Sequence, residues 1–234
     1  MTRATRIAWV AVAFAAATAV YQAATWPDVA ALRSANPKTT AFIERYRSRE
    51  VGAGRRGEVA WRWVPYAAIS PDLKRAVLVG EDIEFFSHSG FSTLEMRKAL
   101  REAWEEKALP RGASTLTQQV AKNLWLTPSY NPLRKLKEAI LTAQLERTLP
   151  KRRILEIHLN VAEFGPGVYG AEAAARRYFG VPASGLDEEQ AAQLAAGLPK
   201  PSRWHPGSTS RVYQRRVRSI LTRMAKAQWL WKEI

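Results

Sequence analysis

A charge-free stretch near the N-terminus restricts this chain more than any other feature of its sequence. Residues 7–24, IAWVAVAFAAATAVYQAA, contain no Asp, Glu, Lys or Arg. As an α-helix this stretch would span roughly 27 Å, close to the thickness of the hydrocarbon core of a bilayer. Trp9 and Trp26 lie near its two ends, where interfacial aromatic residues are typical. The segment therefore predicts a membrane-spanning helix.

Two positive residues predict the orientation of this helix. Arg3 and Arg6 precede the apolar stretch, and positive residues on a short flank favour the cytoplasmic side. We expect residues 1–26 to be a single-pass anchor in the cytoplasmic (inner) membrane, with the rest of the chain on the outer, periplasmic face. A cleaved signal peptide is the alternative, because the stretch is rich in alanine and offers small-residue cleavage sites. Both interpretations export everything after Trp26.

The charge of the chain indicates an anionic partner. Among 234 residues, 47% are hydrophobic and the net charge is +15, which suits a domain with a hydrophobic core and a strongly basic surface. Export argues against nucleic acid and leaves an acidic membrane surface or a phosphorylated substrate. The sequence has no cysteine, which excludes disulfides, thiolate metal ligands and cysteine nucleophiles.

The exported part divides at about residue 57. Residues 27–57 are polar and end in the loop signal VGAGRRG, so we expect a connector with one helix around residues 38–49. Residues 58–64 alternate in the manner of a short strand. The remainder of residues 58–234 shows helical periodicity, apart from a loop at residues 165–170, and this range is expected to form one mainly α domain.

Capping residues predict where the helices of this domain begin. Thr115 and Asp187 are each followed three residues later by a glutamine, as in a capping box, and two other starts place proline at the first helical position. The expected starts are Ser70-Pro71, Thr115, Asn131-Pro132, Pro150 and Asp187. In the helix after Asn131-Pro132, the stripe expected to face inward is Leu133, Leu136 and Ile140.

Residues 81–90, EDIEFFSHSG, place acids beside two phenylalanines. A carboxylate at a helix end against apolar rings loses hydration, which raises its pKa toward the range useful for proton transfer. Glu81, with Asp82 and next to Phe85, is therefore a candidate general base. The alternative, which spacing alone favours, is a surface carboxylate at the edge of the core.

Two further segments could carry charge-based chemistry. In RGASTLTQQVAKN, residues 111–123, a helix N-terminus follows small residues, and Gln118 and Lys122 share one face that could hold a phosphate. Arg134 and Glu138 are four residues apart, which indicates an ordinary salt bridge or a second functional carboxylate. His88 and His158 are too isolated in the sequence for a metal site, so none is predicted.

Five segments, taken in order, resemble the sequence blocks of the peptidoglycan glycosyltransferases of family 51. They are EDIEFFSHSG, GASTLTQQVAKN, RKLKEAILTAQLE, RRILEIHLN with GPGVYGAEAAARRYFG, and LAAGLPKPSRWHP. Such domains occur in bifunctional penicillin-binding proteins and as separate enzymes. Because no transpeptidase domain follows in this sequence, it is similar to the monofunctional biosynthetic peptidoglycan transglycosylases.

The resemblance implies a lysozyme-like, mainly α fold and a reaction that polymerises lipid II, a disaccharide-pentapeptide on undecaprenyl pyrophosphate. Glu81 would be the general base for the 4-hydroxyl of the acceptor sugar. That hydroxyl attacks the anomeric carbon of the lipid-linked chain, with inversion and release of undecaprenyl pyrophosphate. Glu138 matches the second essential glutamate, and Lys122 and Arg134 match cations that hold the pyrophosphate. The residues expected to contact substrate as well are Asp82, Phe85, Ser114, Gln118, Gln119 and Lys135.

The expected partners follow from this reaction. They are lipid II, the growing glycan strand and the bilayer, while cell-wall synthesis or division proteins stay open. The resemblance implies no cofactor and leaves open a divalent cation at the pyrophosphate. A lysozyme-like glycan hydrolase and an inactive lipid II-binding scaffold are the alternative functions.

Two positions depart from the family's pattern. Glu84 and Tyr130 stand where the family usually has cations near the donor phosphates, which predicts weaker donor binding.

One segment is expected to contact the membrane. Residues 124–133, LWLTPSYNPL, are expected to dock on the outer leaflet with Trp125 at the interface, and ordinary core packing is the alternative.

Overall fold

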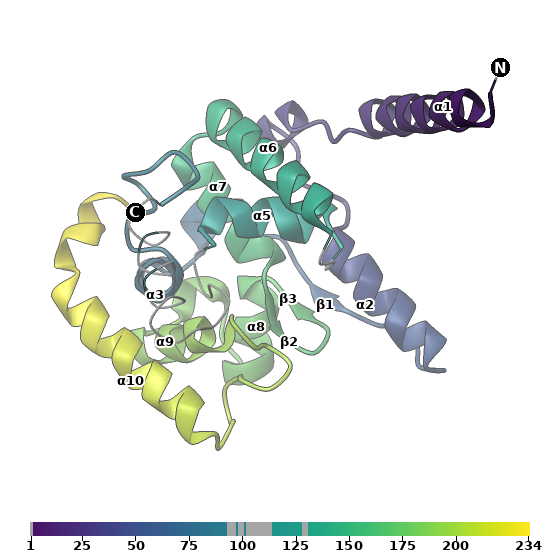
Figure 1. Cartoon of the computed structure of the whole chain (residues 1–234). Coiled ribbons are helices and arrows are strands. Elements are labelled where there is room, and N and C mark those ends of the chain that lie inside the picture. The colour runs from purple at the N-terminus through teal and green to yellow at the C-terminus, as the bar shows by residue number, and fades with distance from the viewer. Residues whose placement is uncertain (1, 93–96, 98–100, 102–113, 128–130) are drawn as a thin grey trace.

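The computed structural model of the chain is mainly helical, which confirms the predicted fold class (Figure 1). The structure describes residues 2–92, 97, 101, 114–127 and 131–234. Its α-helices are α1 (Arg3–Ala24), α2 (Ala41–Gly52), α3 (Pro71–Glu81), α5 (Leu116–Trp125), α6 (Pro132–Thr148), α7 (Lys151–Val161), α8 (Ala171–Phe179), α9 (Glu188–Gly197) and α10 (Arg211–Lys226). Short 3-10 helices span Ala30–Arg33, Tyr66–Ala68, Ala183–Gly185 and Gln228–Lys232.

The predicted helix starts are confirmed, and every one except Pro150 before α7 has a side-chain cap. The Ser70 hydroxyl accepts the Asp72 N–H at 3.1 Å at the start of α3. Both predicted capping boxes form, one at Thr115 before α5 and one at Asp187 before α9. The helix expected around residues 38–49 is α2, which begins after Thr40.

A small sheet interrupts the helices. Strand β1 (Ala60–Trp61) pairs in parallel with β3 (Val168–Tyr169), and β3 pairs antiparallel with β2 (Glu163–Gly165). The loop prediction for residues 165–170 is therefore wrong, since these residues contain β3 and the end of β2. Strands of two or three residues are too short to leave an alternating pattern in the sequence.

The core forms where α3, α5 and α7 meet the helices around them. Helix α3 packs against α9 and α10, while α5 packs against α2, α6 and α7 (Figure 1). The side chains of Leu73, Leu116 and Ile157 are fully buried in this core. Ile43 of α2 is fully buried too, so the segment before residue 57 also contributes to the packing.

Helix α6 faces the opposite way from the prediction. Leu133, Leu136 and Ile140 are 69%, 58% and 42% exposed, whereas Glu138 and Leu141 are buried. The inward stripe was predicted by assuming that the other face of the helix lies in water. That assumption is wrong for α6, whose outer face is apolar and whose inner face carries an ionised group.

The described part of the segment expected to dock on the membrane is packed against the core instead. Leu124 and Leu126 are buried, and the partly buried Trp125 packs against the hydrophobic core. Tyr130 and its two preceding residues lie outside the described residues.

Helix α1 is long and apolar enough to cross a membrane, which is consistent with an anchor or a signal sequence.

Candidate active site

The end of α3 places Glu81 beside the start of α5. The backbone leaves the helix at Asp82, whose buried carboxylate accepts the Leu116 N–H at 2.9 Å and lies 3.0 Å from His88 Nε2. His88 Nδ1 accepts the Gly90 N–H at 3.1 Å, so the imidazole proton is on Nε2 and is donated to Asp82. Asp82 thus ties the two helices together, and its contacts are within the protein.

Both oxygens of Glu81 receive a hydrogen bond. Gln119 Nε2 of α5 donates to Oε2 at 3.0 Å, and Arg216 Nη2 of α10 donates to Oε1 at 2.7 Å. The Glu81 side chain is only 12% exposed. Burial raises the pKa of Glu81, while the charge of Arg216, the Gln119 hydrogen bond and the charge of Lys122 oppose that rise. The result is a buried carboxylate with a raised pKa and a fixed orientation.

Gln119 connects Glu81 to a buried histidine. Because its amide nitrogen donates to Glu81, its oxygen accepts from His158 Nε2 at 3.2 Å. Burial, helped by the charge of Lys122, lowers the pKa of His158 to about 3. The imidazole is therefore neutral near pH 7 and acts as a hydrogen-bond donor that orients Gln119.

The charges of two carboxylates, Glu138 and Glu81, act on Lys122. Burial lowers the pKa of its amine, and the charges of Glu138 and Glu81 act against that lowering. Glu138 is buried on the inner face of α6, where it forms ion pairs with Arg134 at 2.8 Å and with Lys135. Glu138 therefore holds two cations on the helix that faces Lys122, and no described contact places it on a proton-transfer path.

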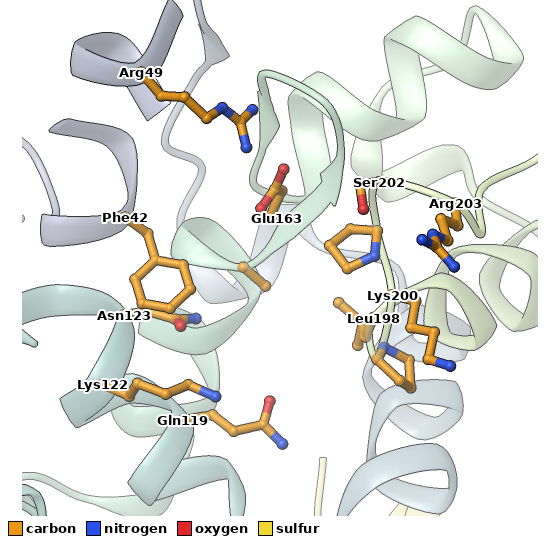
Figure 2. A pocket seen from close by; sticks show the side chains of 13 residues that line it. Phe42, Arg49, Gln119, Lys122, Asn123, Glu163, Leu198, Lys200, Ser202 and Arg203 are labelled. Atoms are coloured by element: carbon orange, nitrogen blue, oxygen red, sulfur yellow. The ribbon is translucent and has the colours of Figure 1, made fainter. Parts of the chain in front are cut away.

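A cavity of about 500 Å³ opens beside Gln119 and Lys122. Figure 2 shows these two side chains on one side of the cavity and Lys200 and Arg203 on the opposite side. Glu163 of β2 also lines it, and burial raises the pKa of Glu163. Other lining residues are Phe42, Arg49, Asn123, Ala162, Leu198, Pro199, Pro201 and Ser202. A cavity with several cations beside a buried carboxylate suits an anionic substrate.

A family model for transglycosylases matches residues 49–225 of this chain. The chain belongs to the transglycosylase family. It is 41% identical over 214 residues to a biosynthetic peptidoglycan transglycosylase of Nitrosospira multiformis, covering 92% of this chain and 93% of that one. It is 46% identical over 183 residues to one of Thiobacillus denitrificans, covering 78% of each chain. The resemblance found in the five sequence segments is thereby confirmed.

Some residues expected to contact the substrate of this transglycosylase have contacts inside the protein. Phe85 is fully buried and meets Phe86 edge to face, with ring centroids 5.2 Å apart. Gln118 accepts the Thr115 N–H at 3.0 Å as part of the capping box. Ser114 is exposed, and its carbonyl lies 3.5 Å from Gln119 Nε2. Glu84, at a position where the family usually has a cation, accepts from the Ser92 hydroxyl at 3.2 Å.

The sequence reasoning missed Arg216 and the role of His158. The buried residues of α10 repeat at the helical period; they are Tyr213, Val217, Ile220 and Met224. Arg216 follows Tyr213 by three residues and precedes Ile220 by four, so its place on the inner face was readable from the helical period. What the period could not tell was that this face of α10 meets the end of α3.

The described residues offer no candidate metal centre. No group of three or more His, Cys, Asp or Glu side chains in that part of the chain could hold a metal ion. Asp82 and His88 are close together, but they bind each other and the N-terminus of α5.

Proposed function

We propose that Glu81 is the general base with which this peptidoglycan glycosyltransferase polymerises glycan strands. The observation that carries the proposal is the buried Glu81 carboxylate, fixed at both oxygens and hydrogen-bonded to Gln119, which lines the cation-rich cavity. A base held in one orientation in a water-poor site can take a proton from a sugar hydroxyl as that hydroxyl attacks. The raised pKa makes the Glu81 carboxylate a stronger base, which favours its taking the proton from the hydroxyl.

The proposed reaction transfers a lipid-linked glycan to an acceptor sugar. The 4-hydroxyl oxygen of the acceptor lipid II forms a bond to the anomeric carbon of the donor, and its proton goes to Glu81. The bond from that carbon to the pyrophosphate oxygen breaks, and the electron pair leaves with undecaprenyl pyrophosphate. Attack from the face opposite the leaving group inverts the configuration.

The leaving pyrophosphate needs cations, and we assign that role to Lys122, Arg134 and Lys135. Lys122 lines the cavity next to Gln119, so it can reach both the base and a ligand. Arg134 and Lys135 are held by Glu138, which we propose acts by placing these charges rather than by moving a proton. Ser114 and Gln119 lie at the same end of α5 and complete the proposed contact set.

We place the catalytic domain at residues 58–234, a connector at residues 27–57 and the membrane anchor at residues 1–26. In this arrangement Arg3 and Arg6 stay in the cytoplasm and the catalytic domain faces the periplasm. The exposed apolar stripe of α6 supports a position against the membrane surface, where a lipid-linked substrate is available.

The deciding experiment for the activity supplies the full chain in vesicles with lipid II and analyses the products. We expect a ladder of glycan strands on a gel. Soluble muropeptides released from preformed polymer, without consumption of lipid II, would instead show a hydrolase. Binding of lipid II with neither product would show a scaffold.

A further inference from the structure

Arg216 reaches the proposed base from a helix that is distant in sequence. It lies 135 residues after Glu81, on the C-terminal helix α10, yellow in Figure 1. One nitrogen, Nη2, donates both to Glu81 Oε1 at 2.7 Å and to the Gly80 carbonyl at 3.1 Å. The guanidinium thus binds the side chain and the backbone of consecutive residues at the end of α3.

The missing side chain of Gly80 allows this approach. A Cβ atom at Gly80 would lie 3.3 Å from Ile220 Cδ1, closer than ordinary contacts between side chains. Ile220 follows Arg216 by one helical turn on the same face of α10. The close packing of Ile220 on Gly80 therefore brings Arg216 within reach of Glu81.

The charges around Glu81 come from several elements. Helix α5 provides Gln119 and Lys122, and α7 places the neutral His158 behind Gln119. At this end of α3, the side chain that α9 places near Gly80 is the apolar Ala195. The next acid, Asp82, is bound to His88 and the α5 N-terminus. Among the described residues, Arg216 is the cation that forms a hydrogen bond with Glu81, and its charge is the largest influence opposing the effect of burial on the Glu81 pKa.

We propose that Arg216 is a positioning residue for Glu81, fixing one carboxylate oxygen while Gln119 fixes the other and balancing the charge of the buried base. This inference rests on the proposed function of Glu81. Two donors on two helices restrict rotation of the carboxylate, which holds the base in one geometry before substrate arrives. A guanidinium suits this task because the two N–H bonds of its Nη2 can serve a carboxylate and a neighbouring carbonyl together.

The test compares pH profiles of kcat/KM for lipid II polymerisation by the full chain. Removing the positive charge in Arg216→Gln raises the Glu81 pKa further, so the acidic limb moves to higher pH. The rate loss relative to wild type is then greatest at low pH and shrinks as pH rises. Arg216→Lys keeps the charge and returns the limb toward its wild-type position. Arg215→Gln, a neighbouring exposed arginine with the same change in net charge, gives the wild-type profile.

An Arg216→Gln profile whose acidic limb is not displaced overturns the proposal, even if the rate falls equally at every pH. If Arg216→Gln does not fold, Arg216→Ala provides the same measurement, because water can enter at a side chain that is 31% exposed. Glu81→Gln in the same assay separates the two levels of the argument. Persisting activity of Glu81→Gln refutes the base itself, whereas an inactive Glu81→Gln with an undisplaced Arg216→Gln limb refutes only the role of Arg216.

Discussion

Two buried carboxylates of this transglycosylase have different environments and therefore different expected roles. Glu81 accepts hydrogen bonds from Arg216 and from the cavity-lining Gln119, and burial raises its pKa. Glu138 is enclosed by two cations of its own helix, Arg134 and Lys135. A carboxylate with a raised pKa suits proton transfer, while one in a tight ion pair suits the placement of charge.

Replacement of Lys122 should weaken donor binding more than it changes the chemical step. A charged donor to a phosphate oxygen contributes roughly 1.5–3 kcal/mol, so Lys122→Ala should raise the half-saturation concentration of lipid II more than about tenfold. The measurement is polymerisation rate against lipid II concentration. Lys226→Ala, at the exposed end of α10, is the control. Equal curves for Lys122→Ala and wild type would remove Lys122 from the site.

The buried His158 should make the folded state sensitive to acid. Its folded pKa of about 3 lies below the ordinary 6.5, so the unfolded chain takes up the proton first. Stability is therefore present above pH 6.5 and is lost as pH falls from there toward 3. Between pH 7.5 and 5.5 the loss should be about 1.4 kcal/mol. Denaturant unfolding of wild type and His158→Phe measures it, and the same pH dependence in both proteins would contradict the assignment.

These residues mark how far the sequence could predict the site. Glu81, Lys122 and Glu138 stand in segments that resemble the family, so their identity was predictable from local sequence. Arg216 and His158 act through contacts between segments that are far apart in the chain, and such contacts leave no local pattern. The cavity-lining Arg49 and Lys200 were missed for the same reason.

The starts of the helices were predictable from the sequence because local caps set them. The face that a helix buries was not predictable where it depends on what lies against the helix. The caps at Ser70, Thr115 and Asp187 satisfy free N–H groups within three residues, so the sequence contains the whole interaction. The burial of α6 depends instead on what covers its outer face. Its apolar stripe is turned outward, away from buried Glu138 and Leu141.

The outward stripe of α6 should bind membranes. Leu133→Gln with Leu136→Gln should reduce liposome binding by residues 27–234 at least about tenfold, because burying one leucine contributes roughly 1.5–3 kcal/mol. Both side chains are exposed, so the unfolding temperature should not change. Val212→Gln on α10, also an exposed apolar residue, is the matched control. Undiminished vesicle binding by the α6 variant would show that the membrane contact lies elsewhere.

The arrangement of the whole chain suits a substrate that is a lipid at one end and a sugar at the other. An apolar helix precedes the domain, an apolar stripe lies on α6, and α3, α5 and α10 bring a carboxylate and its donors together beside a cation-lined cavity (Figure 1). The net charge of +15 is consistent with anionic lipid and pyrophosphate as partners. The account depends on Glu81 being the group that accepts the proton.

The most direct measurement of that claim is the polymerisation rate of Glu81→Gln in vesicles containing lipid II, together with its lipid II affinity. The substitution keeps the size of the side chain and removes its basicity, so the rate should fall on the order of 10²–10⁴-fold. Lipid II affinity should stay within about threefold of wild type, because the substitution removes the base and keeps the side chain's size. A threefold change in affinity corresponds to less than the roughly 1.4 kcal/mol of a tenfold change. Glu189→Gln, the same change at an exposed glutamate in the first turn of α9, should keep the wild-type rate. A Glu81→Gln variant that polymerises at more than half the wild-type rate would contradict the account.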